Sequence, residues 1–240
     1  MAMLLRQGGN PVSAAAPAGE SLWAKARKRF FRHRLAVFGL VVLGLMVLMA
    51  VLAPAIERYS PIELDLSSMS QAPSAAHWLG TDTTGRDVWS RIVHAGRVSL
   101  SVGLVAVSIS TFIGVLVGGV SGYAGGKTDM LLLRLTDMVM AFPSLVMIIT
   151  IASVLGPSIY NTMLVIGMLT WPGIARLVRG QFLSFREQQF VLAARSIGVP
   201  PVQIMFRHLL PNVVGTVTVA ATFGMANAIL QEASLSFLGL

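Results

Sequence analysis

Four long stretches of the sequence contain no Asp, Glu, Lys or Arg, and they limit the folds that are open to the chain. They cover residues 35–56, 98–126, 138–175 and 209–231. A helix needs about 20 predominantly apolar residues to cross the hydrocarbon core of a membrane, and the apolar run of a buried soluble helix is usually much shorter. The four stretches therefore predict membrane-spanning helices, since open strands would leave backbone groups unpaired in lipid.

The third stretch is too long for one crossing, and Gly156 and Pro157 interrupt it near the middle. Because Gly-Pro pairs mark turns, we expect two helices here, joined by a tight turn at 155–158. The predicted fold class is all-α, a polytopic membrane protein with five transmembrane helices. The composition agrees, since only 12% of the residues are charged, against about 25% in soluble domains.

The distribution of Lys and Arg predicts the orientation, because cytoplasmic loops are enriched in both. Segments 1–34, 123–137 and 176–208 would share one side of the membrane and hold 14 of the 18 Lys and Arg residues. The segment 57–97, called the outer segment below, would lie on the other side and holds four. The N-terminus is therefore predicted to be cytoplasmic, and the net charge of +8 reflects topology rather than nucleic-acid binding.

The same pattern predicts the organisation of the chain. We expect a basic cytoplasmic segment at 1–34, a first transmembrane helix at 35–56, the outer segment at 57–97 and a helical core at 98–240. An odd number of crossings would leave Leu240 outside, directly after an apolar string. The sequence is therefore expected to be truncated at its C-terminus.

Small residues at four-residue spacing predict faces for close helix packing, although such residues are common in membrane helices in general. The second crossing carries Ala106, Ser110, Gly114, Gly118 and Gly122, and the fifth carries Ala220, Gly224 and Ala228. Thr218 and Thr222 share one face of the fifth crossing, and we expect them to line a solute pathway.

The sequence argues against several functions. The apolar stretches contain no Asp, Glu, Lys or Arg, which speaks against a proton-driven carrier. The chain has no cysteine and its four histidines are scattered, so no metal or cofactor is expected. Residues 121–128 match a phosphate-binding loop only in part, with Ser121 in place of the first glycine and no preceding strand. The chain is therefore not expected to be an enzyme, and its energy would come from a partner; a self-sufficient secondary transporter is the alternative.

Two polar segments carry further information. In the outer segment, Thr81 or Asp82 is expected to cap a turn, and Asp87 and Arg91 are expected to form a helical i,i+4 pair. In the segment 185–212, Gly198 suits the residue just past a helix end. Pro201 suits the first turn of the next helix.

The segment 185–212 therefore predicts two short helices bent at Gly198. Val191, Ala194 and Ile197 are spaced to form one apolar face of the first helix. His208 is expected to pack or to form a hydrogen bond at the end of the second. An amphipathic helix of this kind lies in the membrane interface or docks into a groove of another protein.

Several motifs resemble a known family. The pair Ala193-Ala194, followed at fixed spacing by Gly198 and by His208-Leu209-Leu210-Pro211, is similar to the EAA loop of ABC-importer permeases. The strings at 79–91, 122–126, 137–143 and 232–239 resemble the C-type permease of peptide, oligopeptide and nickel importers. The likeness covers about residues 28–240. The sequence departs from the family in two ways: Leu192 replaces the glutamate that names the loop, and the sixth crossing is absent.

The resemblance implies an ABC-importer permease in the bacterial inner membrane, with ATP hydrolysed by partner subunits. Its partners would be a homologous second permease, two ATPases, an extracytoplasmic binding protein and membrane lipid. Short peptides or a related solute would be transported, with nickel complexes as the main alternative. The outer loop 79–91 would face the second permease or the binding protein.

The resemblance also assigns residues. The segment 185–212, the coupling loop, would insert into a cleft of the ATPase, through Phe190, Ala193, Ala194, Arg195, Gly198, Val202, Arg207, His208 and Pro211. The extracytoplasmic family motif comprises Gly80, Thr81, Asp82, Gly85, Arg86, Asp87 and Arg91.

Overall fold

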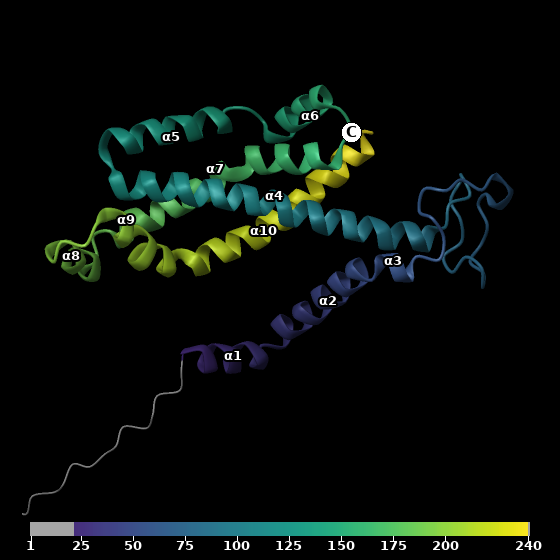
Figure 1. Ribbon diagram of the computed structural model, residues 1–240, viewed down its shortest axis with the longest axis horizontal. Coiled ribbons are helices and arrows are strands. Elements are labelled where there is room, and N and C mark those ends of the chain that lie inside the picture. The colour runs from purple at the N-terminus through teal and green to yellow at the C-terminus, as the bar shows by residue number, and fades with distance from the viewer. Residues whose placement is uncertain (1–21, 240) are drawn as a thin grey trace, which may run out of the picture. The chain divides into compact units, whose positions relative to one another are not determined.

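The computed structural model describes residues 22–239, and this part of the chain is helical apart from turns and the irregular outer segment (Figure 1). The helices are α1 (Leu22–Arg32), α2 (Arg34–Val51), α3 (Ala53–Ile56), the 3₁₀ turn η1 (Leu66–Ser68), α4 (Val88–Ala124), α5 (Gly126–Met140), α6 (Ser144–Leu155), α7 (Ile159–Phe185), α8 (Gln189–Ser196), α9 (Pro201–Gln203), the π-helix η2 (Ile204–Leu209) and α10 (Leu210–Phe237). Within residues 22–239 the only β-type pairing is an isolated bridge between Thr81 and Asp87. The predicted all-α class is confirmed.

The chain divides into two units, 1–48 and 49–240. In the first unit, α1 is basic and α2 is apolar around its whole circumference. The two helices are separated only by His33, whose Nδ1 accepts a hydrogen bond from the N–H of Ala36 (3.2 Å). The helix expected at 35–56 is therefore present, but it ends at Val51. Pro54 then stands in the first turn of α3, a position that proline favours.

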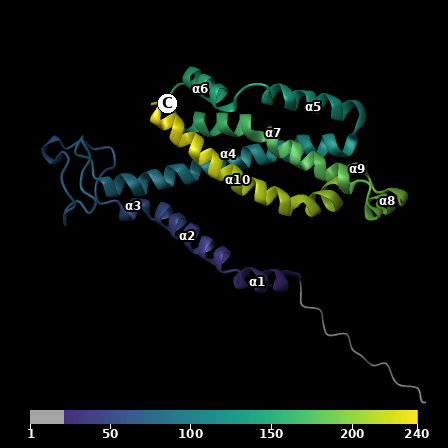
Figure 2. The same cartoon turned by 180° about the vertical axis from the view of Figure 1, so that it is seen from behind.

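The second unit is built on α4, α7 and α10, which lie alongside one another in both views (Figures 1 and 2). Neighbouring positions rise together along α4 and α7, with Gly114 beside Ile174 and Gly122 beside Phe182, so these two helices run in the same direction. The α10 helix runs the opposite way, because Gly103 of α4 lies beside Ile229 of α10, whereas Val107, further along α4, lies beside Gly224.

Small residues on α4 allow the close approach of α7. Ser110, Gly114, Gly118 and Gly122 are buried at four-residue spacing. A Cβ atom on Gly118 would lie only 2.3 Å from the carbonyl oxygen of Ala175, and one on Gly122 would lie 2.7 Å from that of Arg179. Backbone therefore meets backbone along this face, as small-residue stripes permit in membranes. Gly224 of α10 lies less tightly against α4, where an added Cβ would meet Val107 at 3.4 Å.

The middle of the chain differs from the prediction. Residues 123–137, expected to be a cytoplasmic loop, lie mostly in the helix α5. The predicted crossing at 138–155 is not one straight helix, because α5 and α6 meet at a bend of 77°. Pro143 explains the break, since proline lacks the N–H and disfavours a helical residue before it. The described residues contain four helices long and apolar enough to cross a membrane, or five if the bent pair is one span.

The turn expected at 155–158 is present between α6 and α7, with Gly156 at a φ of 84°. Because α4 has 37 residues, it extends over about 55 Å. It begins at the outer segment and ends beside the coupling loop. The structure therefore places the outer segment and the coupling loop at opposite ends of α4.

Candidate functional site

The coupling loop is bent by a well-formed helix stop. At the end of α8, the N–H of Gly198 donates to the carbonyl of Arg195 (3.0 Å) and the N–H of Val199 donates to that of Ala194 (3.1 Å). Gly198 has a φ of 81°, the left-handed conformation that this stop requires. Pro201 then occupies the first turn of α9. The predicted bend at Gly198 is therefore present, but the second short helix is not separate, because residues Pro201–Phe237 form one continuous helical stretch.

An apolar cluster fixes the loop to the helix core. Val191 and Ala194 of α8 and Ile204 and Leu209 of η2 are buried together with residues of α7 and α10. Ile197 does not join them and is 80% exposed, so the predicted three-residue apolar face is wrong at this position. The reason is that Ile197 is the residue after the helix, with φ of −89° and ψ of 7°, where helical spacing no longer applies.

The loop also carries large apolar side chains that the described part of the chain leaves exposed. They are Phe190, Leu192, Ile197, Val202 and Phe206, and each is at least 42% exposed. Among the remaining residues assigned to this region, Ala193, Arg195, Arg207 and Pro211 are exposed and His208 is partly buried. For His208 a backbone contact is seen, since its carbonyl accepts a hydrogen bond from the Asn212 side chain (2.6 Å).

The hydrogen-bonding pattern of the helix changes within the coupling loop. The segment Ile204–Leu209 is a π-helix, a rare form that is frequent at functional sites. An apolar cavity of about 250 Å³ lies beside it, lined by residues of α4, Phe182, Val202, Met205 and Phe206. The π-helix therefore borders an open apolar pocket.

Ionic contacts connect α7 to the turn at Gly125 between α4 and α5, called the elbow below. Arg179 of α7 forms two hydrogen bonds with Asp129 of α5, at 2.6 and 2.7 Å, and the Ser121 hydroxyl donates to the same carboxylate. Arg186 donates to the carbonyl of Gly122 (3.3 Å). Sequence reasoning missed this ion pair, because its residues lie 50 positions apart and no local pattern links them.

One contact reaches α8 itself. The guanidinium of Arg195 lies 5.2 Å from the ring centre of Tyr123, at the end of α4. Cations near an aromatic face are attracted to it. Together with the ion pair, this contact connects α8 and α7 to the elbow between α4 and α5.

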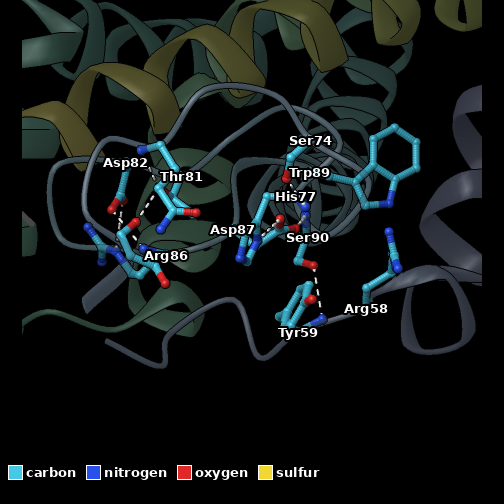
Figure 3. Close-up of polar contacts among 12 residues, drawn as sticks. Arg58, Tyr59, Ser74, His77, Thr81, Asp82, Arg86, Asp87, Trp89 and Ser90 are labelled. Atoms are coloured by element: carbon cyan, nitrogen blue, oxygen red, sulfur yellow. Dashed lines mark hydrogen bonds and ion pairs between the residues drawn. The ribbon is translucent and has the colours of Figure 1, made fainter. Parts of the chain in front are cut away.

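The outer segment is organised by two carboxylates (Figure 3). Asp82 accepts hydrogen bonds from the N–H and hydroxyl groups of Thr84 (2.8 and 2.7 Å) and from the N–H of Arg86 (3.0 Å). The side chains of Arg86 and Arg91 also pair with Asp82. Asp82 therefore caps a turn, as predicted.

Asp87 is the cap of α4. It accepts from the N–H of Ser90 (2.8 Å) and lies 2.9 Å from Nδ1 of His77. The predicted i,i+4 pair between Asp87 and Arg91 is wrong, because the Asp87 carboxylate points back to the start of the helix and Arg91 pairs with Asp82. Ser90 in turn accepts from the N–H of Tyr59 (3.3 Å), which joins the start of the segment to α4.

The geometry holds both carboxyl groups in their ionised form. The pKa of Asp82 lies well below its usual value. The largest cause is the hydrogen bond from the Thr84 side chain, followed by those from the N–H groups of Arg86 and Thr84 and from the Arg86 side chain, which together outweigh burial. Burial raises the pKa of Asp87, but hydrogen bonds from Ser90 and His77 outweigh it and leave this pKa lowered. The two acceptors thus stay charged at neutral pH.

Close contacts require glycine at two positions of the extracytoplasmic family motif. Gly80 and Gly85 have φ of 75° and 77°. A Cβ on Gly85 would lie 1.8 Å from the carbonyl oxygen of Asp65, and one on Gly80 would lie 2.3 Å from that of Gln71. Thr81 is buried and its hydroxyl accepts from the N–H of Gln71 (2.9 Å). All seven motif residues thus lie in one structural unit.

The two threonines expected in a solute pathway are exposed on α10. The hydroxyls of Thr218 and Thr222 donate to the carbonyls of Val214 and Thr218 in the same helix, both at 2.8 Å. Their hydroxyl groups therefore form hydrogen bonds within α10 itself. A cavity of about 350 Å³ lies elsewhere, between the α5–α6 bend and α7.

Comparison with known proteins agrees with this arrangement. Residues 110–240 match the family described as binding-protein-dependent transport system inner membrane component, and residues 21–73 match the N-terminal TM domain of oligopeptide transport permease C. The chain belongs to the family of binding-protein-dependent transport system inner membrane components. It is a membrane-embedded permease component rather than a complete transporter.

Individual relatives cover most of the chain. The oligopeptide transport system permease protein OppC of Haemophilus influenzae is 42% identical over 92% of this chain and 72% of its own length. The dipeptide transport system permease protein DppC of Alkalihalophilus pseudofirmus is 41% identical, with the same two shares. OppC of Bacillus subtilis is 38% identical, again over 92% of this chain and 72% of its own length.

Proposed function

We propose that the chain is one of two homologous permease subunits of an ABC importer that carries short peptides into the cell. ATP is hydrolysed by two partner ATPases, and an extracytoplasmic binding protein delivers the solute. The names of relatives at 38–42% identity, which refer to oligopeptide and dipeptide transport, support the choice of solute over nickel complexes.

The observation that carries the proposal is the exposed apolar surface of the coupling loop. Phe190, Leu192, Ile197, Val202 and Phe206 form an uncovered apolar set on an otherwise anchored element. Exposed apolar side chains on a fixed backbone are typical of a docking surface. The ATPase binds here and pushes α8, and the contacts of Arg195 and Arg186 pass the movement to the elbow between α4 and α5.

The topology supports a cytoplasmic loop. The coupling loop and the outer segment lie at opposite ends of α4. The loop belongs to the set of segments that together hold 14 of the 18 Lys and Arg residues, and segments rich in Lys and Arg stay in the cytoplasm. The N-terminal segment 1–34 is then cytoplasmic, and the motif from Gly80 to Arg91 faces the binding protein or the second permease.

The conformation of Gly198 gives a direct test. An added Cβ at Gly198 would meet no atom within 4 Å, so a substitution acts through the backbone alone. In the left-handed region a side chain costs about 1–2 kcal/mol, and a β-branched one costs more, whereas Asn is tolerated there. We expect Gly198→Val to lower ATP-driven peptide uptake by about tenfold or more, while Gly198→Asn retains it.

The measurement is uptake of labelled tripeptides by the complete complex in proteoliposomes, with membrane insertion of each variant checked by protease protection. Uptake that is equal in Gly198→Val and the wild type contradicts the assigned role of the loop. Uptake by the purified chain without ATPase subunits would show that the chain is a self-sufficient secondary transporter instead. Uptake of nickel complexes in place of peptides would contradict the proposed solute.

A further inference from the structure

The helix α1 is not part of the coupling mechanism proposed above, yet its sequence is unusual. Its 11 residues, Leu22–Arg32, contain five Lys or Arg and no acidic residue. Arg34 follows at the start of α2, and the next carboxylate along the chain is Glu57. Positive charge beside a membrane helix contributes to topology, but topology does not require the charge to be arranged on a helix.

The charges on α1 follow a helical pattern. Residues 25, 28, 29 and 32 are all basic and recur at three- and four-residue spacing, so they belong to one helical face. Residues 22, 26 and 30 are apolar and recur on another face. Phe30 and Phe31 are 40% and 61% exposed, and their rings meet edge to face with centres 5.7 Å apart. The helix is therefore amphipathic, with basic and aromatic residues.

The connection to α2 fixes where this helix lies. Only His33 separates α1 from α2, and the turn is closed by hydrogen bonds from the His33 N–H to the Phe30 carbonyl (3.0 Å) and from Ala36 to His33. The α2 helix has the length and hydropathy of a membrane span and begins at Arg34. The end of α1 must therefore lie within a few residues of the membrane surface, where phosphate headgroups are concentrated.

We propose that α1 lies in the headgroup layer and binds anionic phospholipids through its basic face. Basic clusters next to a membrane helix attract anionic lipid, and helices with basic and aromatic faces lie in the interface plane. This position of α1 depends on α2 spanning the membrane and not on ATP-driven uptake. It can therefore fail while the proposed importer function stands, and the reverse also holds.

The test uses a fluorescent probe on the full chain. The chain contains no cysteine, so Phe30→Cys gives one site for an environment-sensitive dye. The labelled chain is placed in nanodiscs of phosphatidylcholine alone or with phosphatidylglycerol, with and without the partner subunits. We expect the dye to enter the lipid only with phosphatidylglycerol and to leave it at high salt, because salt screens charge.

Charge variants on this labelled background separate binding from structure. Arg29→Gln with Arg32→Gln should lower the ratio of inserted to water-exposed dye by about fivefold for each cation removed. Arg29→Lys with Arg32→Lys retains the charge and should retain the signal. Lys127→Gln with Arg134→Gln removes two exposed cations elsewhere and should also leave the signal unchanged.

Three results would overturn the proposal. They are equal insertion in the two lipid mixtures, insertion that survives loss of the basic residues, and a signal that requires the partner subunits rather than phosphatidylglycerol. The last result would assign α1 to a protein partner.

Discussion

The outer segment and the coupling loop both lie outside the apolar stretches, but they are held in place by different forces. In the outer segment the buried side chains at the motif are polar, namely Thr81, Asp87 and Ser90, and each has a specific hydrogen-bond partner. In the coupling loop the buried residues are apolar, among them Val191 and Ile204. Hydrogen bonds are directional, whereas apolar contact is not.

This difference indicates two mechanical roles. A buried carboxylate with fixed donors permits one arrangement, because a displaced partner leaves a polar group unsatisfied at a cost of about 1–3 kcal/mol. An apolar contact beside a cavity of about 250 Å³ can repack with smaller losses. We infer that the outer segment is a rigid platform, whereas the coupling loop can shift against the helix core when its partner moves.

The largest effect is expected from a charge placed on the coupling loop. Ile197 is 80% exposed, so Ile197→Asp leaves the isolated chain intact. When the ATPase covers this position, the new carboxylate is buried without a partner, which costs several kcal/mol. We expect the affinity of the membrane-embedded chain for its ATPase to fall about 100-fold, as measured by co-purification and titration in nanodiscs.

Ile62 provides a matched control in the outer segment. It is 79% exposed, so Ile62→Asp makes the same chemical change at the other end of α4. It should leave ATPase affinity unchanged. Equal losses in the two variants, or no loss in either, would mean that the two segments do not differ in the way inferred from their packing.

A smaller effect is expected from the cap of α4. Asp87→Ala removes the acceptor for the Ser90 N–H and the partner of His77. Loss of a helix cap costs about 1–2 kcal/mol, and the thermal unfolding midpoint of the chain in detergent should fall accordingly. Asp87→Asn keeps an acceptor for the Ser90 N–H and should lose less than half as much. A drop of the same size in both variants would show that charge, not capping, stabilises this end of α4.

The sequence predicted those features that depend on local patterns. Apolar length located the four helices that are long enough by themselves to cross a membrane, although not the bent pair α5 and α6. The bend at Gly198 followed from glycine and proline chemistry alone. A helical turn at 87–91 was expected, but its continuity with the crossing in one helix from Val88 to Ala124 was not, because Arg91 and Arg97 interrupt the apolar stretch. The helix α5 was missed for the same reason.

Contacts between distant residues could not be predicted in this way. The pair formed by Asp129 and Arg179 depends on how closely α5 and α7 approach, and this distance is set by packing rather than by local sequence. Asp87 was assigned to Arg91 by spacing, but its role as a cap places its carboxylate at the helix start. A single sequence gives the candidates for such pairs, while the fold selects among them.

The smallest effect concerns pH and tests whether the platform depends on ionised carboxylates. The pKa values of Asp65, Asp82 and Asp87 are lowered in the folded chain, and that of an unfolded Asp is about 3.9. A lowered pKa gives stability that is complete above the unfolded value and is lost as the pH falls toward the folded one. Protection of residues 77–91 from hydrogen exchange, corrected for the intrinsic rate, should therefore be constant from pH 7 to 5 and fall below about pH 4.

The coupling loop supplies the reference for this measurement, because residues 189–209 contain no Asp or Glu and their protection should not change over the same range. Asp82→Asn should weaken protection of 77–91 already at pH 6 and reduce its further loss in acid. If protection of 77–91 declined between pH 7 and 5, or if both regions lost it together below pH 4, the outer segment would not owe its rigidity to these carboxylates. The contrast between a platform fixed by charge and a loop held by apolar contact would then have to be abandoned.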